Sequence, residues 1–72
     1  MAEWEQLLDE KILRFRATCD EGSESVGAQR AWLEGYLAAL EIAHTIDSYQ
    51  RNRYLIEISA TEELANRRRK VH

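Results

Sequence analysis

The chain has 72 residues, of which 44% are hydrophobic and 32% are charged, with one Cys, no Pro and a net charge of -3. This length fits one domain at most, and a lone core of this size supplies only ~3–5 kcal/mol of net stability unless something else supports it. One Cys and two His residues argue against a disulfide scaffold and a zinc finger, and the length argues against an enzyme with a large pocket.

The first predicted element is a helix over residues 3–18, because its apolar residues recur every three or four positions and so share one helix face. Leu13 lies off that face. Residues 19–24 predict a turn, in which Gly22 takes the left-handed conformation that ends many helices. Ser23 or Ser25 is then expected to cap the next helix. The apolar face of the first helix consists of Trp4, Leu7, Leu8, Ile12 and Phe15.

A long central helix is predicted over residues 25–47, with an apolar stripe broad enough to contact more than one neighbour. Asp47 and Gln50 have the spacing of a capping box, so the helix is expected to stop and restart there. The alternative is one uninterrupted helix from residue 26 to beyond residue 51. The stripe consists of Trp32, Leu33, Tyr36, Leu37, Leu40, Ala43 and Ile46.

A third helical segment is predicted over residues 48–68, followed by a basic tail over residues 67–72. Residues 54–58 are also rich enough in β-branched and aromatic side chains to form a short strand. Ser59 and Glu62 match a second capping box, with Thr61 as another possible helix start. The sequence therefore predicts an all-α single domain, either a helical hairpin or a small three-helix protein with a long central helix.

Small residues repeat every four positions along the central helix, at Gly27, Ala31, Gly35 and Ala39. Such a stripe leaves a groove in which another helix backbone can approach closely. Gly35 costs about 1 kcal/mol inside a helix relative to Ala, which indicates a packing role, although simple tolerance on an exposed face is the alternative. We expect a homo-oligomer, with a dimer favoured. Its contacts would be this groove with Trp32, Tyr36, Leu37 and Leu40.

The aromatic residues are numerous for so short a chain, and Trp, Tyr and Arg are the residues that most often anchor interfaces. Packing of Trp4 against Trp32 across the hairpin is the structural alternative. The residues predicted to bind a partner are Trp4, Trp32, Tyr36, Tyr49, Arg53 and Tyr54.

Charge is divided unevenly along the chain. Residues 1–24 carry seven acids against three bases, whereas residues 51–72 carry three acids against six bases. Opposite charges of this kind can attract within a bundle or between two subunits, and the acidic part can steer the chain toward a basic partner surface. The predicted steering residues are Glu3, Glu5, Asp9, Glu10, Asp20, Glu21 and Glu24.

A rival hypothesis makes the chain a nucleic-acid-binding regulator, since guanidinium groups bind phosphates. Its candidate contacts are Arg51, Arg53, Arg67, Arg68, Arg69 and Lys70. The structural alternative is that the terminal cations complement a helix dipole, and the acidity of the whole chain favours this alternative.

Catalytic and metal sites find little support. His44 with Glu41 is only half of a two-helix metal motif, and Cys19 lies beside Asp20 and Glu21, which would blunt its nucleophilicity. We expect no catalytic residue, metal, cofactor or membrane segment, and a cytoplasmic location. The predicted function is a non-catalytic module that docks a helix on a larger protein of unknown identity, as an adaptor or inhibitor.

Overall fold

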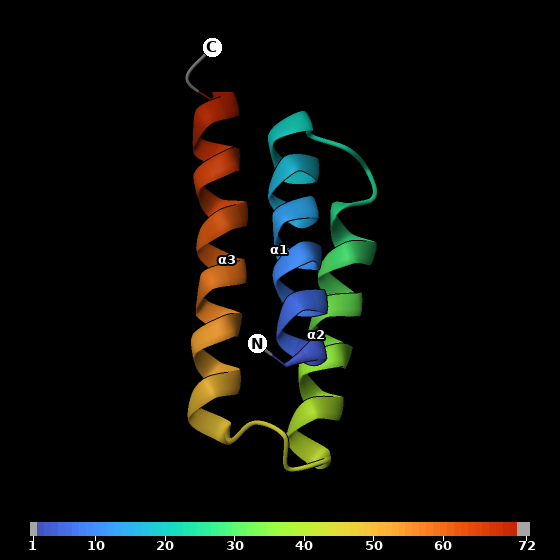
Figure 1. Cartoon of the computed structure of the whole chain (residues 1–72). Coiled ribbons are helices and arrows are strands. Elements are labelled where there is room, and N and C mark those ends of the chain that lie inside the picture. Colours follow the sequence, from blue (N-terminus) through green and yellow to red (C-terminus); the bar gives the residue numbers. More distant parts are fainter. Residues whose placement is uncertain (1, 71–72) are drawn as a thin grey trace.

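Three helices run alternately up and down, so that α1 and α3 are parallel and α2 is antiparallel to both (Figure 1). The computed structural model describes residues 2–70, with side chains as far as residue 68. The helices are α1 (Glu3–Glu21), α2 (Val26–Ile42) and α3 (Ser48–Lys70). Each helix contacts the other two, and the bundle is 43 Å long. The all-α prediction is confirmed, with three helices and no strand within residues 2–70.

The core lies along the axis where the three helices meet. Phe15 from α1, Leu37 from α2 and Ile58 from α3 are almost fully buried, and they belong to one apolar cluster. The predicted stripe of α1 supplies two further core positions, Leu8 and Ile12, and Leu13 is exposed as expected. Leu7 belongs to the same predicted stripe but is 39% exposed, so the helical spacing of α1 identifies most of its buried face.

α1 is longer than predicted, because residues 19–21 are helical and only Gly22 leaves the helix, with a left-handed φ of 72°. The backbone N–H groups of Gly22 and Ser23 donate to the carbonyls of Cys19 and Thr18, which closes the helix end. Cys19 continues the buried stripe by one more turn, so the helix gains burial by extending to the glycine. The predicted turn over residues 19–24 is wrong for its first three residues.

Ser25 occupies the position before α2, but its hydroxyl makes no capping bond to the helix backbone. The hydroxyl of Ser23 instead accepts a hydrogen bond from the backbone N–H of Ser25 at 3.2 Å. The serines therefore stabilise the turn, and the expected cap on the helix itself does not form.

α2 ends at Ile42, before the predicted boundary at residue 47, and the alternative of one uninterrupted helix is wrong. His44 takes a left-handed φ of 60°, which is uncommon for a residue with a Cβ. The N–H groups of His44 and Thr45 donate to the carbonyls of Glu41 and Leu40. Ile46 continues the apolar spacing of α2, but it lies in the turn after the helix, and its side chain is buried. Spacing alone therefore overextends the helix.

The predicted pair of Asp47 and Gln50 forms at the start of α3. The Gln50 backbone N–H donates to the Asp47 carboxylate at 2.8 Å, and the Asp47 N–H donates to the Gln50 side-chain oxygen at 3.0 Å. From there the helix is continuous, so the short strand over residues 54–58 and the second helix start are both wrong. Thr61 donates its hydroxyl to the Glu57 carbonyl instead of capping a helix.

Replacing His44 by Gly should raise the free energy of unfolding by about 0.5–1 kcal/mol, because Gly adopts the left-handed conformation without a Cβ clash. His44→Val should lower it, since a β-branched residue is strained there. Chemical denaturation of the three proteins measures both effects. A stability loss in His44→Gly would show instead that the imidazole itself supports the turn.

Candidate docking surfaces

The side of α2 that faces away from the bundle is small and uncharged. It is called here the α2 outward face, and it consists of Gly27, Ala28, Ala31, Gly35, Ala39 and Ile42, all of them exposed. Ile42 is 79% exposed. Apart from the backbone of its own helix, a Cβ added at Gly27 or at Gly35 would meet no atom of the described residues within 4 Å, so packing among these residues requires neither glycine.

The predicted self-association residues separate in the structure. The four small residues spaced by four lie together on the α2 outward face. Leu37 and Leu40 are in contrast only 0% and 8% exposed and belong to the core. Their assignment to a contact between subunits is wrong, because a partner has no access to them without unfolding the bundle.

Aromatic side chains form a shelf between α1 and α2. The Trp32 ring stacks on Tyr36 with centroids 5.1 Å apart, and the Lys11 ammonium lies 5.2 Å from the Trp32 centroid. The Tyr36 hydroxyl donates to the backbone carbonyl of Trp4 at 3.4 Å, while the Trp4 side chain packs against the core. Trp32 itself remains 46% exposed. An open groove of about 280 Å³ adjoins this shelf, called here the Trp32 groove; it is lined by Lys11, Arg14, Ala28, Gln29, Trp32 and Leu33.

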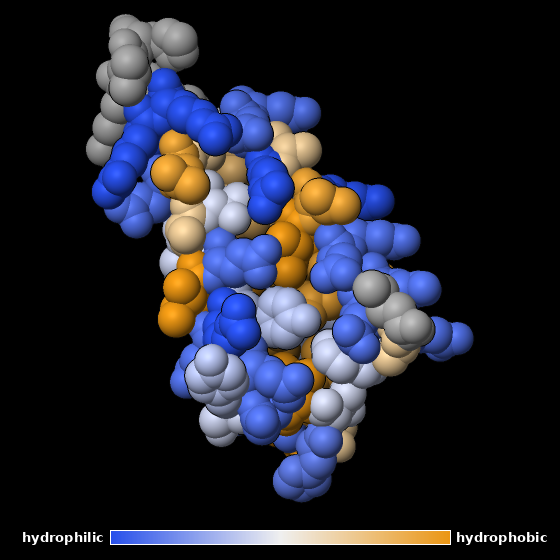
Figure 2. Space-filling view, turned by 60° about the vertical axis from the view of Figure 1, so that its left-hand side comes forward, coloured by the Kyte–Doolittle hydropathy of each residue, from blue (hydrophilic) through white to orange (hydrophobic). Residues whose placement is uncertain are grey.

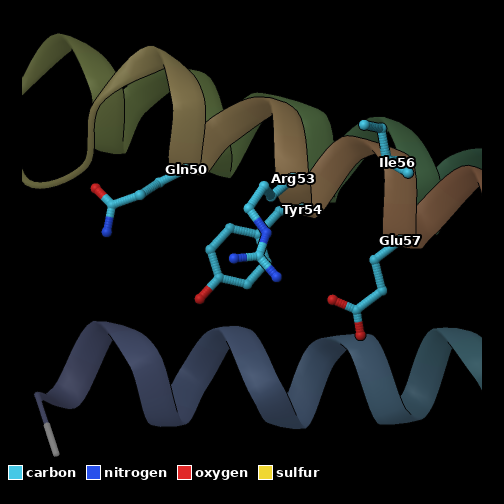
Figure 3. A pocket seen from close by; sticks show the side chains of 5 residues that line it. All are labelled: Gln50, Arg53, Tyr54, Ile56 and Glu57. Atoms are coloured by element: carbon cyan, nitrogen blue, oxygen red, sulfur yellow. The ribbon is translucent and has the colours of Figure 1, made fainter.

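The other predicted partner-binding residues lie on a separate surface, on α3. The Arg53 guanidinium lies 6.0 Å from the centroid of the Tyr49 ring, and Tyr54 is half-buried. Figure 3 shows Arg53, Tyr54 and Glu57 directed toward α1, in a groove of about 600 Å³ that Ile56 also lines. The six predicted anchors are therefore divided between two surfaces.

Acidic side chains of α1 gather on this second surface. The pKa of Tyr54 is raised, first by burial and then by the carboxylates of Asp9, Glu5 and Glu57. None of the predicted steering residues belongs to α2, so the acidic surface and the α2 outward face are distinct. Figure 2, which brings the α3 side forward, shows hydrophobic surface broken up by hydrophilic side chains.

Arginines tie α3 to the rest of the bundle, a feature that sequence reasoning missed. Arg51 donates to Glu41 at 2.9 Å, and Arg30 bridges Glu34 and Glu62 at 3.0 and 3.3 Å. The Ser48 hydroxyl and then Arg51 lower the pKa of the Glu41 carboxyl. Only the complementary charges on α2 and α3 could have indicated these contacts.

Most described candidates for nucleic-acid binding are engaged by carboxylates of this chain. Besides Arg51, Arg67 pairs with Glu63 at 2.6 Å and Arg68 with Asp20 at 3.5 Å. The Asp20 pair joins the acidic first helix to the basic last helix within one chain, on the surface of the bundle. The side chains of Arg69 and Lys70, and the tail beyond residue 70, lie outside the described residues.

The residues of the weak metal motif, Glu41 and His44, lie at the end of α2 and in the turn that follows it. His44 is exposed in the turn after α2, and Glu41 faces Ser48 and Arg51. Among the described residues, no group of three or more His, Cys, Asp and Glu is placed to hold a metal ion. Within residues 2–70 no helix has both the length and the apolar character needed to cross a bilayer.

No protein-family model, curated protein or solved structure matches the chain.

Gly35→Ala should raise the free energy of unfolding by about 1 kcal/mol, because helix propensity improves and the new Cβ meets open space. Ala39→Gly, the reverse change on the same face, should lower it by a similar amount. Chemical denaturation at a concentration where the protein is monomeric measures both. A loss in Gly35→Ala would mean that the lack of a Cβ matters within the monomer.

Tyr54 predicts a loss of stability at alkaline pH. Folding raises the pKa of the Tyr54 phenol and so favours its neutral form. The resulting contribution to the free energy of unfolding is fully present below the ordinary pKa of 10.0, and it is lost as the pH rises through the folded-state pKa. Tyr54→Phe should therefore make the alkaline loss of stability shallower. Tyr49→Phe is the control, because Tyr49 is exposed. Denaturation midpoints measured across the alkaline range compare the variants, and equal slopes would contradict the prediction.

Proposed function

We propose that this chain is a non-catalytic interaction module, an adaptor or inhibitor, which docks a helix of a larger protein on the α2 outward face. One observation carries the proposal: α2 is apolar on two sides, and the bundle uses only one of them. The inner side buries Leu33 and Leu37. The outward side presents an exposed Ile42 among small residues, and the nearby acid Glu34 is bound by Arg30.

The two glycines on this face support helix docking in particular. Small side chains let helix axes approach closely, so that many backbone and Cβ atoms come into van der Waals contact. Gly35 costs the isolated helix about 1 kcal/mol, and no contact among the described residues requires the missing Cβ. A helix from another molecule supplies the missing reason for glycine at this position.

The same face is proposed to pair two copies of the chain when no partner is bound. A two-fold contact places the same patch on both subunits, and an uncharged stripe is compatible with itself because it brings no like charges together. The homodimer proposed here uses Ala31 and Gly35, without the buried leucines.

A bulky cation on the α2 outward face should abolish docking. Ala31→Arg is expected to lose both the dimer, seen by sedimentation, and the partner captured by affinity purification from the source cells. Ala60→Arg is the matched control, because Ala60 is also an exposed helical alanine but lies on α3. Circular dichroism checks that both variants remain folded.

Two results would contradict the proposal. One is a wild-type mass near 8.4 kDa at every concentration together with no captured protein. The other is that Ala31→Arg still forms the dimer and still captures the partner as well as the wild type and Ala60→Arg do.

A further inference from the structure

We infer that the docked helix is acidic: its carboxylates bind Lys11 and Arg14 at the rim of the α2 outward face, while an apolar side chain packs on Trp32. This inference rests on the proposed function and specifies the chemistry of the partner. It follows from the Trp32 groove, where an exposed aromatic shelf, two cations without a carboxylate partner among the described residues, and the small residues of α2 meet.

The aromatic shelf is held in place before any partner binds. Trp32 is stacked on Tyr36, and Tyr36 is fixed in turn by its hydrogen bond to the Trp4 carbonyl. A large ring that is already ordered loses little conformational entropy on binding, and for this reason such rings are good anchors. An apolar side chain packed against the exposed part of Trp32 would bury a ring that Tyr36 and Lys11 cover only in part.

The Lys11 ammonium lies over the Trp32 ring, but no described carboxylate binds either cation beside the shelf. Among the described residues, neither Lys11 nor Arg14 forms an ion pair with a carboxylate, whereas Arg30, Arg51, Arg67 and Arg68 all do. Lys11 and Arg14 are three residues apart on α1, which separates them by about 4.5 Å along the helix axis. Carboxylates at positions i and i+3 or i+4 of a partner helix have a matching spacing.

The groove and the α2 outward face form one continuous surface, because Ala28 belongs to both. A helix that lies along the small residues of α2 therefore brings one flank to the two cations. Its opposite flank meets the rim near Glu34 and Arg30, where the charges already neutralise each other. The acidic requirement thus applies to one flank of the partner helix only.

Other occupants fit less well. A nucleic acid would bring a continuous line of phosphates to two cations on an acidic chain, and binding of that kind normally uses a larger basic surface. A second copy would present its own α2 outward face, which contains no carboxylate. A segment with paired acids and an apolar anchor is complementary to both features of the groove.

Selection from a phage-displayed library of amphipathic helices, using the full chain as bait, tests this inference. We expect enriched peptides with Asp or Glu at i and i+3 or i+4 beside an apolar anchor. Combined Lys11→Glu and Arg14→Glu should weaken their binding about tenfold or more, and peptides with Lys at the acidic positions should recover it. Combined Arg16→Glu and Arg53→Glu is the matched control, since these cations are also free of ion pairs but lie outside the groove.

The outcomes separate the inference from the proposed function. Loss of binding in Ala31→Arg without any effect of the Lys11 and Arg14 changes would keep the docking face and overturn the acidic partner. Equal loss in the control pair would also overturn it, because only net charge would then matter. Failure to select any binder, or binders insensitive to Ala31→Arg, would overturn both. If Lys11→Glu disturbs folding, combined Lys11→Gln and Arg14→Gln give the same comparison without charge reversal, with a smaller expected loss.

Discussion

The burial of one side of α2 in the shared core sets the orientation of this helix, and the surface of the molecule follows from it. Leu33 and Leu37 lie in the same apolar cluster as Phe15 of α1 and Ile58 of α3, so α2 cannot rotate without exposing them. Because side chains on a helix have fixed angular positions, this burial also decides which residues point away from the bundle. The exposure of Ala31, Gly35 and Ile42 is thus a consequence of the core.

α3 depends on polar contacts more than the other helices do. Its buried apolar side chains are few, and Tyr49, Ile56 and Leu64 point to solvent. Exposed ion pairs contribute only ~0–1 kcal/mol each, but pairs from Arg30 and Arg51 fix where α3 lies against α2. The hydrogen bond to Glu34, with the charge of Glu62, raises the pKa of Arg30, as expected for a cation held between two carboxylates. These contacts give the third helix a defined register that its apolar residues alone would specify weakly.

Sequence periodicity was sufficient for the three helices and for most of the inner faces of α1 and α2, because helical spacing reflects burial. Leu7 and Trp32 share that spacing but are 39% and 46% exposed. Periodicity failed at helix ends. Ile46 shares the apolar spacing of α2, but it lies in the following turn, and Cys19 belongs to α1, which continues up to Gly22. Periodicity placed Leu37 and Gly35 on different sides of one helix but assigned both to self-association, although Leu37 is in the core and Gly35 is exposed. The Trp32 groove was not predictable, because it joins Lys11 of α1 to a ring on α2 and depends on how two helices pack. The small-residue stripe itself was visible in the sequence, and the structure adds that no part of the described chain covers its glycines.

The up-and-down order of the helices also bears on how fast the chain reaches this structure. Two of the three helix contacts join neighbours along the chain, across the turns at Gly22 and His44, and only the contact of α1 with α3 joins helices that are separated by another helix. Topologies dominated by local contacts fold in microseconds to milliseconds. With no proline in the sequence, the slow isomerisation that delays many proteins is absent. Brief unfolding of such a bundle would therefore interrupt the proposed docking for no longer than about a few milliseconds.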